Sequence, residues 1–554
     1  MYNPLPPFPF TIPISMKNFI TTLDQYLMAG LAWIERRKRL LFLLGLFLLA
    51  LAAGSLLLWS TAEHGIGVRS DSVEYIWGAQ TLASGEGLGR LSGEGDFKPL
   101  IQFPPLYSTT LAVFERFGVG AWEGARWLAA VFFAANIVLI GLAVFRLTSS
   151  RVFALAAAGF ALVAPVVFEV NIWAMTEAPY VTFVLLGFLV LDDFFRLGQV
   201  RLLIYAGLCL GLALLTRYVG ASALGTAGLV LLLRPGKPWL TKVKEGALLA
   251  AVAGLPIGLW MIRNLLVAGS ATNKILNYHL ISAEKWEVFR NTLSAWVSPL
   301  ENFFLIGKRR LAALLGIALG AFLYYRSGRA AKPAEPPGTL LGWLFVVYLP
   351  AYLFIVFFSV LYTGAAIPLD DRMMYPLYTI LIVAVFSGLF FLWKRSRGAS
   401  PALGLASLVL FGLLVYTLAE SYAADTLSLA IESRERGKGY ALAELAEREV
   451  VQRLADYPDD YLIYTDNVHQ LYYFSGRLAY LFPISFDTAT QQEIGEGYAA
   501  SLEAIQHRLA DGEKIMFVFF FWEDLDIALI EEYFPQMQMI VGGEQGYLYV
   551  SPGD

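Results

Sequence analysis

The residues of this sequence that could take part in chemistry stand at the ends of long apolar segments. Asp71 and Glu74 follow the first such segment, and Glu177 begins a later one. Further ionisable or amide side chains occupy comparable positions: Lys98, Arg217, Arg263, Asn264, Asp370, Asp371 and Arg372. Ionisable groups at membrane depth are costly, so a set gathered on one side indicates a functional cleft rather than separate helix caps or snorkelling side chains.

This combination of carboxylates and guanidinium groups suits the transfer of a group from a lipid phosphate to a hydroxyl. A carboxylate partly desolvated by the neighbouring "YIW" (75–77) is a stronger base than one in water. Guanidinium groups hold a phosphate through forked hydrogen bonds and can absorb the charge of a phosphate leaving group. We therefore expect a base beside a phosphate clamp, at the level of the lipid headgroups.

The composition predicts a polytopic helical membrane protein. Of the 554 residues, 57% are hydrophobic and only 16% are charged, and the mean hydropathy is +0.58. The single cysteine, Cys209, excludes a disulfide within the chain, and we interpret it as a buried helix residue. The four histidines show no metal-ligand spacing.

Apolar segments of about 20 residues predict roughly eleven spans. They are residues 40–60, 126–145, 152–168, 178–195, 201–216, 218–233, 246–267, 309–325, 339–361, 373–393 and 401–419, of which 201–216 and 218–233 could also form one bent helix. The basic "ERRKRL" (35–40) precedes the first span, so the N-terminus is predicted to be cytoplasmic. Alternation then places the other basic loops inside, except "GKRR" (307–310), and places the candidate residues outside.

The chain is expected to have three parts: a cytoplasmic lead (1–39), a membrane domain (40–420, with a first outer loop at 61–125) and a soluble extracytoplasmic α/β domain (425–554). The last part holds 23 acidic and 8 basic residues, whereas the remainder is basic. "DYLIYTD" (460–466) and "EKIMFVFFFW" (513–522) indicate buried strands. Helices are predicted over 440–456 and 500–512, and no catalytic motif is evident in this part.

Several segments, in order, carry a resemblance to a known family. They are "DSVEYIWGAQTLASGEGL", "FPPLYSTTLAVFERFGV", "AWEGARWLAAVF", "TEAPYVTFVLL", "LLTRYVGASAL", "LPIGLWMIRNLLVAGSATN" and "DDRMMYPLYTILIV". Together they resemble membrane glycosyltransferases of the GT-C fold. More narrowly, they are similar to the protein mannosyltransferase-like family that includes aminoarabinose transferases and rhizobial lipopolysaccharide sugar transferases. The resemblance covers about residues 40–395, and it rests on order and spacing rather than on one specific motif.

The resemblance implies a polyprenyl-phosphate sugar donor and an inverting transfer on the extracytoplasmic face. It places the family's catalytic aspartate on Asp71 and the second acidic position on Glu177. Many relatives have His or Lys where this chain has Phe103, so another cation, such as Lys98 or "GKRR", is needed for the donor phosphate. The expected phosphate-binding residues are Lys98, Arg217, Arg263 and Arg372, and the expected lining residues are Glu74, Tyr75, Pro104, Pro105, Tyr107, Asn264 and Asp371.

Two of these positions carry further expectations. Pro104 and Pro105 should delay the start of a short membrane-surface helix to residues 106–110. Glu74 has no firm family counterpart, and its simpler interpretation is a solvated helix face.

The predicted protein is thus a multi-pass plasma-membrane glycosyltransferase of the cell envelope, acting on a glycan, lipid or protein acceptor without nucleic acid. The resemblance implies no required cofactor, although Asp71, Glu74, Asp370 and Asp371 are oxygen ligands that suit a divalent cation. Three alternatives remain open. A lipid-linked glycan polymerase or ligase would need a longer arginine-rich loop, a transporter would place its charges mid-span, and a scaffold would use the acidic tail.

Overall fold

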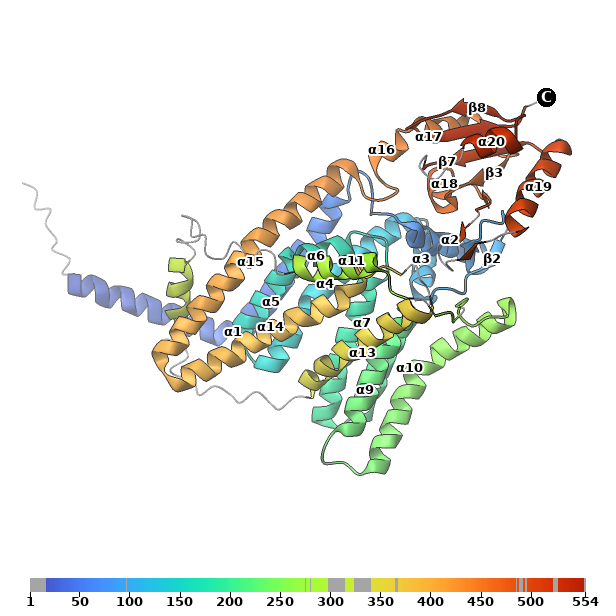
Figure 1. The fold of residues 1–554 in the computed structure, drawn as a ribbon. Helices are drawn as coiled ribbons and strands as arrows, with labels where there is room; N and C mark the ends of the chain where they lie inside the picture. Colours follow the sequence, from blue (N-terminus) through green and yellow to red (C-terminus); the bar gives the residue numbers. More distant parts are fainter. Residues whose placement is uncertain are drawn as a thin grey trace, which may run out of the picture.

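The structure is a computed structural model. It describes residues 16–95, 97–274, 276–278, 280–296, 314–322, 340–363, 367–484, 486–487, 492–493, 496–521 and 527–552. A bundle of long apolar helices forms most of the chain, and a small domain containing a sheet lies at one end of the bundle, beside the first loop (Figure 1).

Within the described residues, seven helices are long and apolar enough to cross a membrane. They are α1 (Met16–Ser60, with the apolar part at Arg37–Ser60), α4 (Ala121–Thr148), α7 (Glu177–Leu197), α10 (Trp239–Ala268), α13 (Leu341–Tyr362), α14 (Asp371–Ala399) and α15 (Pro401–Arg436). Each coincides with a predicted span. The polytopic helical prediction is therefore confirmed.

The other predicted spans differ from single straight helices. The segment 152–168 is a pair, α5 (Arg151–Val163) and α6 (Pro165–Asn171), bent by 60°. Pro165 at the start of α6 explains the break, because proline cannot continue the hydrogen bonding of the preceding helix. The segments 201–216 and 218–233 are two shorter apolar helices, α8 (Val200–Thr216) and α9 (Ala221–Leu233, preceded by the 3-10 turn Tyr218–Gly220), separated at Arg217, whose backbone is extended. Of the segment 309–325, only 314–322 lie within the described residues, and they are helical.

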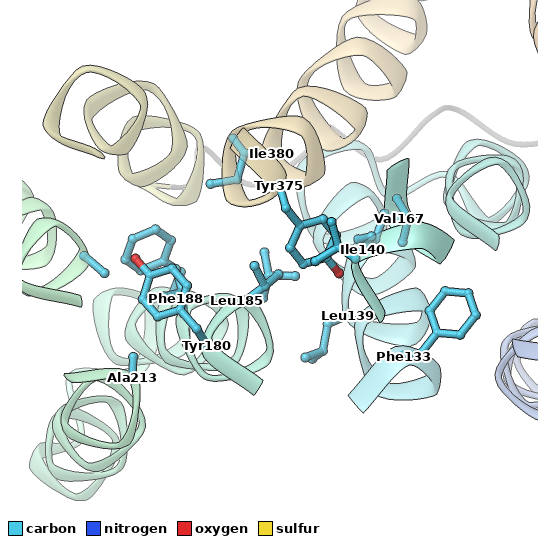
Figure 2. Close-up of a cluster of buried hydrophobic side chains, with 14 of the residues drawn as sticks. Phe133, Leu139, Ile140, Val167, Tyr180, Leu185, Phe188, Ala213, Tyr375 and Ile380 are labelled. Carbon is cyan, nitrogen blue, oxygen red and sulfur yellow. The ribbon is translucent and has the colours of Figure 1, made fainter. Parts of the chain in front are cut away.

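A continuous apolar core joins the membrane helices. Helix α7 packs against α8 and α4, and α14 packs against α15 and α4. Figure 2 shows part of this core, where Tyr375 of α14 and Ile140 of α4 lie next to each other and Leu185 and Phe188 of α7 lie to one side of them. These side chains are almost fully buried. The core therefore fixes the relative positions of the helix ends that carry the candidate residues.

The first loop and the segment that follows α10 contain short elements. They are α2 (Ser70–Ser84), β1 (Gly89–Leu91), β2 (Phe97–Pro99), α3 (Leu106–Arg116) and α11 (Ala283–Ala295). Strands β1 and β2 form an antiparallel hairpin. Helix α3 begins directly after Pro105, as predicted from the two prolines. Gly85 ends α2 with a φ of 96°, a conformation that favours glycine.

The C-terminal region is an α/β domain, as predicted. Its five-stranded sheet has the order β4-β3-β7-β9-β8, with β4, β3 and β7 parallel and β9 antiparallel to both of its neighbours. The strands are β3 (Leu462–Thr465), β4 (Tyr480–Leu481), β7 (Ile515–Phe519), β8 (Gln538–Val541) and β9 (Tyr547–Val550), and β5 (Phe486–Asp487) pairs separately with β6 (Gln492–Glu493). The longer helices are α18 (Val468–Ser475), α19 (Glu496–Ala510) and α20 (Ile527–Tyr533).

One prediction about this region is corrected. The predicted helix 440–456 is broken into α16 (Ala443–Ala446), α17 (Glu449–Arg453) and a 3-10 turn (Leu454–Asp456). The backbone leaves the helical conformation at Leu442 and Arg448, so the amphipathic pattern is distributed over short pieces. Helix α15 continues to Arg436, so the last long helix extends past residue 425.

Candidate active site

A single arginine joins the two carboxylates that the sequence singles out. Nη2 of Arg372 lies 2.6 Å from Oδ2 of Asp71, and Nε of the same guanidinium donates a hydrogen bond to Oε1 of Glu177. Asp71 is in the first turn of α2, Glu177 starts α7 and Arg372 is in the first turn of α14. Three chain segments far apart in sequence therefore converge at their helix N-termini.

A second arginine extends this cluster. Nη1 of Arg217 donates hydrogen bonds to Oε1 of Glu177 and, at 3.0 Å, to Oγ1 of Thr176. Asp71, Arg372, Glu177 and Arg217 thus form a chain of alternating charges. The Glu177 side chain is only 2% exposed, whereas that of Asp71 is 29% exposed. Asp71 is therefore the carboxylate of the pair that an incoming substrate can reach.

A buried asparagine of α4 fixes the helix ends that carry this cluster. Nδ2 of Asn136 donates to the carbonyl of Ala178, 3.0 Å away, and to the hydroxyl of Tyr375, 3.2 Å away. Ala178 follows Glu177 directly, and Tyr375 lies one turn after Arg372. Asn136 is fully buried. It therefore sets the spacing between Glu177 and Arg372, because a buried amide keeps its hydrogen-bond partners.

Aromatic side chains support Asp71 from the other side. The ring of Tyr75 lies 4.9 Å from that of Phe103 and 5.3 Å from that of Tyr107. The Tyr75 hydroxyl is 3.5 Å from Oγ1 of Thr176. Burial and the negative charge of Asp71 raise the pKa of Tyr75, so its phenol stays protonated. Pro104 is buried and Pro105 precedes α3, so both serve mainly to position this aromatic group.

Arg263 and Asn264 form a separate polar group at the end of α10. Nη1 of Arg263 donates to the carbonyl of Leu100 at 3.0 Å, and its guanidinium lies 4.9 Å from the Trp260 ring. Asn264 is buried and donates to the carbonyl of Ala271 at 2.8 Å. The Trp260 indole nitrogen donates to the Tyr218 hydroxyl at 3.2 Å. Since Tyr218 follows Arg217 in the chain, this hydrogen bond connects α10 to the segment that carries Arg217.

The remaining basic candidates are placed differently. Lys98 is on β2, where its ammonium lies 2.9 Å from Oε2 of Glu94. Glu94 in turn bridges to Tyr480 of the C-terminal domain. The hairpin thus pairs Lys98 with Glu94, and its role at the donor phosphate stays a prediction. The "GKRR" segment (307–310) lies outside the described residues.

The interpretation of Glu74 as part of a solvated face is wrong. Glu74 is only 4% exposed. Its Oε2 accepts a hydrogen bond from the backbone nitrogen of Leu91 at 3.2 Å, and its Oε1 lies 2.9 Å from Nε2 of His469. The physical reason is that the C-terminal domain covers this face of α2. Glu74 therefore belongs to an interface.

One cavity opens from the cluster, and a second cavity adjoins the first. The first, about 190 Å³, is lined by Arg372 and Glu177 together with Asp370 and Arg69. The second, about 360 Å³, extends towards α15 and includes Asp425. Both share two carboxylates, Glu169 and Asp371. Five carboxylates therefore line the two cavities against three cations, Arg69, Arg372 and Lys438, and neither Arg217 nor Arg263 is among the described lining residues.

Part of the chain is similar in sequence to a known protein family, and the whole fold is similar to solved structures. Residues 91–264 match the family described as dolichyl-phosphate-mannose-protein mannosyltransferase. No curated protein sequence matches the chain. Among solved structures, the arabinofuranosyltransferase AftD from Mycobacteria has a TM-score of 0.50 at 14% identity, covering 92% of this chain and 40% of AftD. The chain has the GT-C fold.

Two further GT-C structures cover a larger share of their own chains. ArnT from Cupriavidus metallidurans aligns with 91% of this GT-C protein and 97% of its own chain, at 13% identity and a TM-score of 0.48. The oligosaccharyltransferase from Archaeoglobus fulgidus aligns with 88% of this chain and 69% of its own, at 14% identity and a TM-score of 0.46. The matched family region begins after Asp71 but includes Glu177, Arg217 and Arg263.

Sequence reasoning missed several residues of this GT-C site. Arg69 lies 4.1 Å from the ring of Trp173, and the Trp173 indole nitrogen donates to Oε1 of Glu169 at 3.2 Å. Lys438, from the segment before the C-terminal domain, lies 2.5 Å from Oε2 of Glu169. Glu169 and Trp173 have helical spacing and stand just before Glu177, so the sequence could have marked them as neighbours of the site. No local pattern pointed to Lys438.

The described part of this GT-C protein includes the metal ligands suggested by the sequence, Asp370 and Asp371 among them. The described residues contain no group of three or more His, Cys, Asp or Glu side chains that could hold a metal ion. Asp370 accepts from the backbone nitrogen of Met373 at 3.1 Å, and Asp371 accepts from the Trp296 indole at 2.9 Å. These two carboxylates therefore already have protein partners.

Proposed function

We propose that this GT-C protein transfers a sugar from a polyprenyl-phosphate donor to an acceptor hydroxyl, with inversion at the anomeric carbon. The observation that carries the proposal is the reachable carboxylate of Asp71, held by Arg372 in a buried cluster with Glu177 and Arg217. The description of the matched family, which names a dolichyl-phosphate sugar, supports the donor class.

In the proposed reaction, Asp71 takes the proton of the acceptor hydroxyl. The acceptor oxygen forms a bond to the anomeric carbon, and the bond from that carbon to the phosphate oxygen breaks. The polyprenyl phosphate leaves with the electron pair. A positioned general base and fixed cations at the leaving group are the contributions that such a displacement needs.

Charge balance gives Arg372 a second role in this step. Before reaction, Asp71 and Glu177 balance Arg372 and Arg217. Once Asp71 is protonated, its attraction for the Arg372 guanidinium falls, and that guanidinium can pair with the departing phosphate. Positive charge is thereby supplied at the phosphate, where negative charge develops. Because the cluster is already in place, little reorganisation is needed.

The two sides of the cluster suit different substrates. We assign the donor phosphate to the side of Arg217 and Arg263, and the acceptor to the acidic cavities that contain Glu169 and Asp371. An acidic wall with aromatic side chains suits a hydroxyl-rich acceptor better than an anionic one. Glycan, lipid and protein acceptors all supply hydroxyls, and the sugar can be a hexose or a pentose.

We propose that the site and the C-terminal domain face the extracytoplasmic side. Helix α7 runs from Glu177 at the site to a basic end, where Arg196 and Arg146 pair with Asp192 and Asp193. Basic residues favour the cytoplasmic side, which supports this orientation. In a Cys209→Ser background, a cysteine at exposed Asp511 should react with a membrane-impermeant thiol reagent in intact cells; labelling only after lysis would reverse the orientation.

The function is tested with washed membranes and a panel of labelled sugars, each offered on polyprenyl phosphate and on a nucleotide. We expect label to appear in a new glycosidic product only from a lipid-linked donor. Transfer from nucleotide sugars alone would contradict the donor assignment. Movement of sugar across the membrane without a new bond would instead identify a transporter.

A further inference from the structure

The C-terminal domain contacts the helix that carries the proposed base. Helix α18 packs on α2, as Figure 1 shows. His469 of α18 approaches Glu74, with 2.9 Å between Nε2 and Oε1. Glu74 lies three residues after Asp71, one turn along α2. A contact made by the C-terminal domain is therefore within one helical turn of the site.

Glu74 is a strong attachment point because it is buried. A buried carboxylate is costly unless its oxygens are hydrogen-bonded. One oxygen accepts from the backbone nitrogen of Leu91, at 3.2 Å, and the other faces His469. Glu74 therefore joins α2 to the hairpin through Leu91 and to the C-terminal domain through His469.

Other contacts extend the same interface. The Tyr472 hydroxyl donates to Oε1 of Gln80 at 2.9 Å, and the Tyr472 ring lies 5.0 Å from that of Trp77. Helix α2 has 15 residues, a length that is marginal for an isolated helix in water. Its position is therefore set by tertiary contacts, and α18 provides several of them.

The backbone just before α2 is fixed by the same region. The nitrogen of Gly67 donates to the carbonyl of Ile172 at 2.9 Å, and the nitrogen of Val68 donates to the carbonyl of Lys438 at 3.2 Å. The nitrogen of Tyr440 donates back to the carbonyl of Val68 at 2.9 Å. The start of α2 thus lies between the segment that precedes Glu177 and the linker to the C-terminal domain.

We infer that the C-terminal domain is part of the catalytic unit and that His469 is a positioning residue, which acts through Glu74 to hold Asp71 against Arg372. The inference rests on the proposed glycosyl transfer. Displacing a catalytic group by about 1 Å can lower a rate by about a hundredfold. Loss of the His469 contact should therefore reduce turnover, although His469 touches neither Asp71 nor Arg372 in the described contacts.

The test compares two substitutions of His469 in the full-length protein. His469→Leu removes the partner of Glu74, whereas His469→Gln can donate an amide hydrogen to the same oxygen. We expect His469→Leu to lower kcat at least about tenfold, with the donor KM changed less than about twofold, because Arg217 and Arg263 lie on other elements. His469→Gln should restore kcat to within about threefold of the unchanged protein.

Amide hydrogen exchange of residues 70–84 provides a readout that does not depend on activity. It should accelerate in His469→Leu and not in His469→Gln. Tyr472→Phe is the matched control: it removes a hydrogen bond between the same helices but leaves Glu74 and His469 paired, so kcat should fall less than about twofold.

Unchanged exchange in His469→Leu, or equal loss of kcat in His469→Leu and His469→Gln, would overturn the inference. If the unchanged protein transfers sugar from no polyprenyl-phosphate donor, the proposed function fails. The exchange measurement then still decides whether His469 fixes α2.

Discussion

Replacing Arg372 by lysine separates the charge of this residue from its geometry. The guanidinium reaches Asp71 with one nitrogen and Glu177 with another. A lysine ammonium keeps the positive charge but lacks the rigid fork that serves two partners. Because Glu177 is the more deeply buried carboxylate, we expect the ammonium to stay with it and to release Asp71.

The expected loss of activity follows from the hydrogen bond to Asp71 that the lysine variant no longer makes. A hydrogen bond to a charged group contributes about 1.5–3 kcal/mol. The Asp71 side chain is 29% exposed, so we take the lower end of that range. About 1.4 kcal/mol corresponds to a tenfold change in rate. Arg372→Lys should therefore lower kcat/KM about tenfold. Arg372→Met would be a poorer test, because breaking a buried pair costs about 3–5 kcal/mol of stability.

The assay is sugar transfer by purified protein in lipid vesicles, with thermal unfolding measured on the same preparation. Arg395→Lys, an exposed position near the other end of α14, is the control and should keep both activity and stability. An Arg372→Lys variant that unfolds at the normal temperature and retains full kcat/KM would refute the reasoning. It would show that bridging the two carboxylates has no part in turnover.

Three further predictions concern the cluster and its surroundings. Glu177→Gln leaves Arg217 and Arg372 close together without their shared anion, so we expect an unfolding temperature lower than that of the unchanged protein and a loss of activity; a stable, active variant would contradict this. Gly67→Ala should lower stability, because a Cβ there would lie 2.9 Å from the Trp173 ring; unchanged thermal unfolding would refute the claim of close packing. Treatment with EDTA should leave transfer unchanged, and a loss that Mg²⁺ or Mn²⁺ restores would establish a metal requirement.

From the sequence, we could predict on which side of the membrane, and at what depth in it, the candidate residues lie. Hydropathy located the helices, and the basic loops placed Asp71, Glu177, Arg217 and Arg372 at helix ends on one face. The structure brings those four together. Their chemical roles stay predictions. Hydropathy does not say which helices are neighbours, because that depends on side chains such as Asn136, whose partners are far away in sequence.

The errors have the same physical origin. Glu74 had the pattern of an exposed helix position, but its burial depends on His469, which lies 395 residues away. Lys98 was predicted at the donor phosphate; in the hairpin of β1 and β2 its ammonium lies 2.9 Å from Glu94, and its role at the phosphate stays a prediction. The amphipathic pattern over 440–456 did not reveal the breaks at Leu442 and Arg448, because backbone turns depend on tertiary contacts as well as on local sequence.

The measurement that tests the central claim most directly is the turnover of Asp71→Asn with a polyprenyl-phosphate sugar, beside a matched Asp193→Asn variant. Each aspartate pairs with an arginine, and their side chains are 29% and 30% exposed, but Asp193 lies at the opposite end of α7 from the site. We expect Asp71→Asn to fold and to lose transfer, and Asp193→Asn to retain it. Near-normal transfer by Asp71→Asn would contradict the account, because the proposed base would then be dispensable.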